Sequence, residues 1–475
     1  MIVLLALLST APAHAGPLTY EDALQRSLER NPELLGAGSS RLGAQGALLA
    51  SRSSFDPQLK ASLGYNSSKN ESTQQFGDVL SNYKNLGWDL SVSDFLATGT
   101  SVKLGTSGGQ SAFRYELRDT GLVVESQDPQ YSTDVSASLS QSLLQGFKTS
   151  YNLQGVRHAQ RALTQAELSL ASTRQQVLAD TASSYWALYQ AQQLVDISEQ
   201  ALTVSEEERR IVLAKVDAGD LAPVEKSRVE AAVVQARSAL LQAQDNATAA
   251  AEALQLLVGD EPDGEVQAIT APAEPTELDL DDQAMIEDAL AHNPDLQVAR
   301  MSEEGADLDL RDARHARLPE LTATASMTFR GYDTAIGASY AELASGALHD
   351  WYLGGDLAVP LGNRADRGSL QQKDAALGEA RISRESLERS VRQQVRSQVR
   401  AVEQARLKLD LARANLDLAQ QTLAAEKALQ DAGRALQKDV LDAIRTVDDA
   451  KVAVEQARAD HALAVVELGR LRGAL

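Results

Sequence analysis

The chain contains an internal duplication. A shift of 262 residues, without a gap, places Asn31-Pro32 on Asn293-Pro294 and Pro57 on Pro319. The 34 positions from Leu28 to Ala61 then hold 13 identities, far more than unrelated segments share. A repeat of this kind means that one supersecondary unit is built twice. Any fold for this chain must therefore contain two similar halves, which we place at residues 16–259 and 283–475.

Each half changes from a helical pattern to a period of two. Thr19 is a candidate N-cap for the first helix, with Asp22 three residues on. After Pro57 and Pro319, apolar residues alternate with small or polar ones, which predicts strands with one apolar face. The alternating apolar positions, return strands included, are Leu59, Ala61, Leu63, Tyr65, Tyr131, Val135, Ala137, Leu139, Leu143, Leu321, Ala323, Ala325, Met327, Phe329, Trp351, Leu353, Leu357 and Val359.

We expect these strands within about 57–145 and about 319–361. An additional hairpin, roughly 84–109 around Thr98-Gly99, occurs in the first half alone. The Ser, Asn and Gly residues around the strands indicate loops. The pattern does not decide whether the added hairpin enlarges the sheet or folds over it.

Two long helices are predicted at about 147–217 and about 363–431, since neither range contains Pro. In the second, apolar residues recur at strict sevens, which implies left-handed supercoiling. Such a helix spans roughly 100 Å, whereas the helices before the strands and after the long helices span roughly 37 and 57 Å. Two shorter helices stacked end to end therefore nearly match one long helix. The heptad residues are Val395, Val402, Leu409, Leu416 and Leu423, and Leu411 and Leu418 keep a second register.

Each long helix ends in the same short motif. Ala218-Gly219 and Ala432-Gly433 precede Glu225 and Asp439 by the same spacing. The segments 218–259 and 432–473 share 11 of 42 residues and both end in Gly. Two copies of one hairpin tip are therefore predicted, at 218–225 and 432–442. Between the halves, 260–282 is an acidic, Pro-containing connector that we expect on the outside, where the shorter helices meet.

Composition limits the cellular setting and the partners. Residues 1–15 hold a short apolar core followed by Ala13-His14-Ala15, which indicates a cleaved signal peptide. The net charge of −21 argues against nucleic acid as a partner. The chain contains 0 Cys, so we expect neither disulfides nor a lipidated cysteine. No later run is apolar enough for a transmembrane helix.

Strands of about ten residues with one apolar face fit an outer-membrane β-barrel. Four to six strands cannot close a barrel, and lipid does not tolerate an open sheet edge. Several chains would therefore share one barrel, and an ordinary soluble sheet is the alternative. Candidates for an aromatic girdle are Trp88, Trp351, Tyr352, Tyr131 and Tyr65, while Tyr185, Trp186 and Tyr189 are expected to be packing residues.

Four motifs in order resemble the TolC family of outer-membrane efflux proteins. They are an Asn-Pro-Glu/Asp-Leu helix start, Pro-x-Leu before a strand, Ala-Val-Pro-Leu-Gly-Asn-Arg at 358–364, and Ala-Gly-x5-Asp-Val-Leu-Asp-Ala at the second tip. The resemblance covers nearly the whole mature chain. It implies a mainly α homotrimer with a twelve-helix periplasmic α-barrel, continued by a shared twelve-strand β-barrel in outer-membrane lipid. It also implies an exit duct that serves a periplasmic adaptor and an inner-membrane transporter.

The resemblance assigns roles at the tips. Asp439 and Asp442 would line the periplasmic gate, Glu225 would take the equivalent place in the first tip, and Gly219 and Gly433 would shape adaptor-contact turns. The alternative is that these acids are solvated helix-start residues favoured by the helix dipole. Family members also lock the mouth with a Tyr and an Arg. This chain has Gln430 and Ala435 at those positions, so its lock must differ.

Two other classes of protein remain as alternatives. One is a non-conducting exported coiled-coil scaffold or adhesin. The other is an enzyme, for which no catalytic motif, cofactor or metal site is predicted: the six His residues are scattered, and Asp279, Asp281 and Asp282 are better explained as a solvated linker than as a Ca²⁺ site.

Overall fold

The computed structural model describes residues 16–74, 77–117, 120–126, 128–219, 221–261, 266–274, 281–432 and 434–474. The predicted signal peptide lies outside these residues. The chain forms two compact units, and neither unit corresponds to one repeat. Unit 1 comprises residues 1–42, 165–301 and 382–475, and unit 2 comprises residues 43–164 and 302–381. Each unit therefore contains segments of both repeats.

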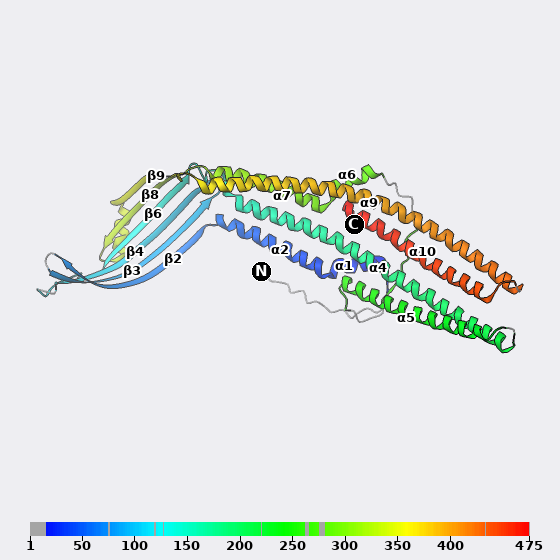
Figure 1. Cartoon of the computed structure of the whole chain (residues 1–475). Coiled ribbons are helices and arrows are strands. Elements are labelled where there is room, and N and C mark those ends of the chain that lie inside the picture. Colours follow the sequence, from blue (N-terminus) through cyan, green and yellow to red (C-terminus); the bar gives the residue numbers. More distant parts are fainter. Residues whose placement is uncertain are drawn as a thin grey trace. The chain divides into compact units, whose positions relative to one another are not determined.

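Unit 2 holds one antiparallel sheet in the order β2-β3-β4-β6-β8-β9, with the short β5 paired to β4 (Figure 1). The short β5 has 4 residues, and the other strands, with 11 to 20 residues, exceed the expected ten. Their bounds are β2 Gln58–Gln74, β3 Gly77–Leu96, β4 Thr100–Leu117, β5 Leu122–Glu125, β6 Gln130–Ser142, β8 Glu320–Asp333 and β9 Leu348–Ala358.

The prediction of a loop between the last two strands is wrong in one place. Residues Ile336–Ser345 form a helix, α8, in a stretch whose Gly and Ser residues indicated a loop. A Cβ at Gly331 would lie 1.9 Å from the carbonyl oxygen of Ser339. The absence of a side chain at Gly331 therefore lets α8 lie directly on β8.

The helices account for most of the remaining chain. Thr19 caps the first of them as predicted, because its Oγ1 accepts a hydrogen bond from the Asp22 amide at 3.1 Å. The helices are α1 Tyr20–Arg30, α2 Pro32–Arg52, the 3-10 turn η1 Ser53–Phe55, α3 Thr149–Asn152, α4 Gln154–Asp217, α5 Val224–Val258, α6 Asp282–His292, α7 Pro294–Ala316, α9 Arg364–Asp431 and α10 Gln437–Arg472. Two short strands, β1 Gly16–Leu18 and β7 Val266–Ala268, pair in parallel in unit 1. In the described part of the chain, none of the helices contains an apolar stretch of the length that a membrane span needs.

In unit 1 the shorter helices meet end to end, as their lengths predicted. Gly259 closes α5 with a φ of 75° and lies against Arg30, the last residue of α1. Gly473 closes α10 with a φ of 73° and lies against His292, the last residue of α6. The two repeats therefore form the same junction twice.

The heptad residues supply the core of unit 1. Val395, Val402 and Leu409 are 0–2 % exposed and pack on α10 or α6. Leu411 and Leu418, which keep the second register, are 70 % and 61 % exposed. The predicted packing role of the aromatic group on α4 is confirmed, because Tyr185, Trp186 and Tyr189 join a cluster with Leu18, Leu254 and Val258.

Candidate functional site

The first predicted tip connects α4 to α5. Gly219 has a φ of +81°, in the left-handed region where a side chain is strained. No atom lies within 4 Å of the position a Cβ would take there, so the turn itself requires glycine. Glu225 lies in the first turn of α5, and its carboxylate pairs with Arg228 at 2.8 Å. This acid is therefore partly neutralised by its own helix.

The second tip connects α9 to α10, and Gly433 lies outside the described residues. Asp439 accepts a hydrogen bond from the Leu436 amide through Oδ2 at 3.1 Å. This is the interaction expected of an acid at a helix start. Asp442, three residues on, has a side chain 54 % exposed and lies 3.8 Å from the Lys438 ammonium. Asp439 thus has a structural role, while Asp442 is the more open of the two carboxylates.

The two long helices approach each other near their tips. Burial raises the pKa of the Glu208 carboxyl on α4, and the positive charges of Lys215 and of Lys427 on α9 oppose that rise. Glu208 and Lys427 are therefore close enough to interact, although they belong to different repeats. This proximity brings the two tips to the same end of unit 1. At this end the carboxylates of Glu225 and Asp442 each lie near a cationic side chain of the same helix, Arg228 and Lys438.

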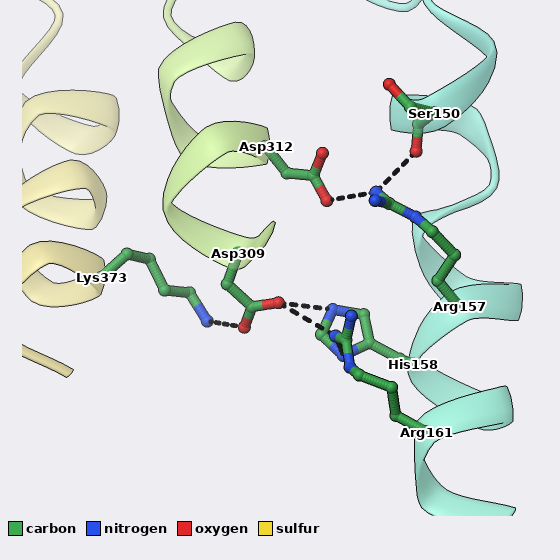
Figure 2. Close-up of polar contacts among 7 residues, drawn as sticks. All are labelled: Ser150, Arg157, His158, Arg161, Asp309, Asp312 and Lys373. Atoms are coloured by element: carbon green, nitrogen blue, oxygen red, sulfur yellow. Dashed lines mark hydrogen bonds and ion pairs between the residues drawn. The ribbon is translucent and has the colours of Figure 1, made fainter. Parts of the chain in front are cut away.

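Unit 2 contains an ionic cluster that the sequence did not predict (Figure 2). Asp309 of α7 lies 3.0 Å from Lys373 of α9 and 3.2 Å from Arg161 of α4. The His158 ring lies 3.1 Å from the same carboxylate, and Arg157 pairs with Asp312 at 2.7 Å. Arg157 also donates to the Ser150 carbonyl oxygen at 2.7 Å. The cluster thus fastens three helices together in unit 2.

The ionic cluster is better explained as a structural contact between helices than as a catalytic site. Its two carboxylates are each occupied by cationic side chains, and Asp309 and Asp312 are only 18 % and 14 % exposed. Within the described ranges, no group of three or more His, Cys, Asp and Glu side chains is placed to hold a metal ion.

The sequence matches the family model described as "Outer membrane efflux protein" over residues 100–260 and 285–474. The chain belongs to the outer membrane efflux protein family. The predicted resemblance is therefore confirmed, and the two matched ranges correspond to much of the two repeats. The family is one of efflux channel proteins and not of enzymes.

Two named proteins are similar in sequence to this chain over most of its length. The chain is 24 % identical over 359 residues to the outer membrane efflux protein BepC of Brucella suis biovar 1, covering 75 % of this chain and 76 % of the relative. It is also 24 % identical over 462 residues to the outer membrane protein TolC of Vibrio cholerae, covering 94 % and 89 %. Both relatives are outer-membrane proteins by name.

Solved structures of outer-membrane channels share the fold. The CmeC outer membrane channel of Campylobacter jejuni has a TM-score of 0.71 at 17 % identity, covering 96 % of this chain and 85 % of that one. The outer membrane protein VceC of Vibrio cholerae has a TM-score of 0.68 at 16 % identity, covering 96 % of each. The mainly helical efflux-protein fold is therefore established for this chain.

Proposed function

We propose that this protein is the outer-membrane exit duct of a tripartite efflux or type I secretion system. The proposal rests on the sheet of unit 2, which has an exposed apolar face and, as far as the described strands extend, two edges without a partner strand. On β2, Leu59 and Leu63 are 71 % and 76 % exposed, and on β9 Trp351 is 75 % exposed. Such a face is suited to lipid.

The two edge strands of the sheet need partner strands, which further copies of the chain would supply. Among the described strands, β2 and β9 each pair on one side only. An open edge in lipid leaves backbone amides and carbonyls without partners, at a cost of several kcal/mol per group. Three copies that pair β2 with β9 of the next copy would close the sheet into a barrel.

The helices support the same assembly. α4 and α9 each run as one long helix. The ends of α5 and α10 meet the starts of α2 and α7, where Asn31 donates to Leu257 and Asn293 to Leu471, so these helices supply two stacked pairs. Four helical positions in each of three copies give a ring of twelve. The exposed Leu411 and Leu418 would then pack on a neighbouring helix of the ring. The ring of helices would extend through the periplasm to the outer membrane.

The duct would conduct passively. An inner-membrane transporter would deliver cargo, and a periplasmic adaptor would contact the turns at Gly219 and Gly433. Asp439, Asp442 and Glu225 would place negative charge at the periplasmic mouth. Because Gln430 and Ala435 replace the Tyr and Arg of other family members, a different contact would hold the mouth closed.

Purified mature protein, beginning at residue 16, tests the proposal. We expect a trimer by native mass measurement in detergent, heat-modifiable mobility on gels, and release of a small entrapped dye from liposomes. A monomer that stays in the aqueous phase without detergent would overturn the proposal. A non-conducting scaffold, the alternative, would give neither heat-modifiable mobility nor dye release.

A further inference from the structure

We propose that the β3–β4 hairpin forms part of the membrane barrel wall. Each chain then contributes six strands, and three chains close a barrel of eighteen strands where a four-stranded contribution would give twelve. This inference rests on the proposed exit duct and specifies the width of its outer end. It concerns two strands of the first repeat that have no counterpart among the described residues of the second.

The pairing of the hairpin is continuous on both sides. β3 pairs with β2 from Gly77–Gln74 to Ser93–Gln58, and with β4 along nearly its whole length. β4 in turn pairs with β6 from Thr100–Gln141 to Ser111–Gln130. No pairing between β2 and β6 occurs among the described residues. The hairpin therefore separates two strands that would otherwise be neighbours.

The apolar face of the sheet continues across the hairpin. Residues paired directly across antiparallel strands lie on the same face. Leu59 of β2 pairs with Val92 of β3, Val92 with Leu104 of β4, and Leu104 with Ala137 of β6. Val92 and Leu104 are 44 % and 56 % exposed, so the exposed apolar face includes the hairpin.

The opposite face is polar across the same strands. Lys60 of β2 pairs with Ser91 of β3. One position along the ladder, Ser93 pairs with Lys103, and Lys103 with Ser138 of β6. At this level of the sheet one face is therefore apolar and the other polar, which is what the wall of a water-filled membrane barrel requires. A loop folded over the barrel mouth would not contact lipid on one side, so nothing would favour this alternation.

The turn of the hairpin is fastened to the base of the sheet. Gly99 has a φ of +79°, and a Cβ there would lie 2.1 Å from the Gly146 carbonyl oxygen. The Asn152 side-chain amide donates to the carbonyl oxygens of Ala97 at 2.9 Å and Gly146 at 2.7 Å. The Ser142 amide donates to the Gly99 carbonyl oxygen at 3.0 Å. These bonds hold the turn level with the end of β6.

The added strands would widen the exit. With strands about 4.8 Å apart and tilted by about 40°, eighteen strands give a backbone diameter of about 36 Å, and twelve give about 24 Å. A ring of twelve helices about 10 Å apart measures roughly 38 Å between axes. The outer barrel would thus be as wide as the helical ring, and bulky cargo that passes the ring would not be retained at the exit.

Paired cysteine variants test this inference, since the natural chain contains 0 Cys. Leu104→Cys and Lys103→Cys probe the two faces of β4, and both parent residues are exposed in the chain. Leu59→Cys, on the rung of Leu104, and Lys60→Cys, the next residue of β2, are the matched control pair. Each variant is reconstituted in lipid vesicles and treated with a charged, membrane-impermeant maleimide.

We expect Lys103→Cys and Lys60→Cys to react at least tenfold faster than Leu104→Cys and Leu59→Cys. Equal, fast reaction at positions 103 and 104, with alternation kept at 59 and 60, would overturn the inference while leaving the duct intact. Loss of alternation in both pairs would overturn the proposed membrane duct itself, and the inference with it. Electron microscopy of the trimer, which counts the strands directly, provides a second reading: twelve strands would refute the inference.

Discussion

The side-chain amide of Asn31 donates a hydrogen bond to the carbonyl oxygen of Leu257 at 3.0 Å. In the other repeat, Asn293 donates to Leu471 at 3.3 Å. Each Asn also caps the helix that follows it, since its Oδ1 accepts from backbone amides within the next three residues. One side chain thus joins the end of a returning helix to the start of another, twice in the chain.

Replacing Asn31 with Ala should lower the free energy of unfolding by about 1–3 kcal/mol, because a cap and a bond to a carbonyl group are both lost. Asn293→Ala should have a similar effect. Denaturant unfolding of the mature protein in detergent measures it. Asn246→Ala, on the exposed surface of α5, is the matched control and should change stability little. Equal effects at positions 31 and 246 would contradict the role of the junction.

Gly259→Ala should be more disruptive than Gly219→Ala. Both residues have positive φ, at 75° and 81°, so each substitution carries a backbone cost of about 1–2 kcal/mol. At Gly259 the new Cβ would also lie 2.8 Å from the Arg30 carbonyl oxygen, whereas at Gly219 it would meet nothing within 4 Å. Thermal unfolding compares the two variants. A larger loss at Gly219 would show that the junction tolerates an added methyl group.

Local patterns predicted much of this fold, and long-range contacts did not follow from them. The heptads at Val395, Val402 and Leu409 indicated a long helix because helical packing repeats within one segment. The Thr98-Gly99 turn indicated a hairpin. The sequence pattern did not predict that both strands of this hairpin pair within the sheet, because the pairing of β4 with β6 is a long-range contact. Helix α8 was missed because its contact with Gly331 is a tertiary one.

The candidate site was predicted less completely. The duplication pointed to Glu225 and Asp439 as equivalent acids, but spacing alone could not reveal that Asp439 accepts from the Leu436 amide. The ionic cluster was missed because Arg161 and Asp309 are 148 residues apart in the chain. No sequence signal other than the charges themselves marks those residues as partners.

Asp309→Asn should destabilise unit 2 by about 1–3 kcal/mol, because it leaves Lys373, Arg161 and His158 close together without their shared carboxylate. Partial solvent screening keeps the effect in this range. Asp307→Asn is the control: Asp307 pairs with Arg311 within the same helix and is more exposed. It should cost no more than about 0.5 kcal/mol. Proteolysis of the folded trimer compares local opening in the two variants, and equal cleavage rates would refute the structural role of the cluster.

Acidification should destabilise the protein through His461 of α10. Burial, and then the positive charge of Arg406, hold the pKa of His461 below its ordinary value, while Asp410 opposes the shift. The unfolded chain binds a proton at His461 more readily than the folded chain does. The stability that neutral His461 contributes is therefore complete above about pH 6.5 and is lost as the pH falls through the folded pKa. His461→Gln should therefore flatten the dependence of the unfolding free energy on pH between 7.5 and 5.5. The pKa of His315 is lowered in the same direction by burial, so part of the slope should persist. An unchanged slope in His461→Gln would contradict the prediction.

The tip acids should make the channel cation-selective if they line its mouth. Asp442→Asn is the cleaner variant, because Asp439 also caps α10. We expect reduced cation selectivity and weaker block by multivalent cations in Asp442→Asn, and a larger change when Asp439→Asn is added. Reversal potentials in a salt gradient give the measurement. Unchanged selectivity in the double variant would place these carboxylates away from the ion path.

Single-channel recording of the wild-type mature protein in planar lipid bilayers shows whether three copies of this chain form a conducting duct. We expect discrete, stepwise conductance from purified trimers, with cation selectivity. Trimers that insert into the bilayer without producing conductance steps, or protein that fails to associate with lipid, would contradict it.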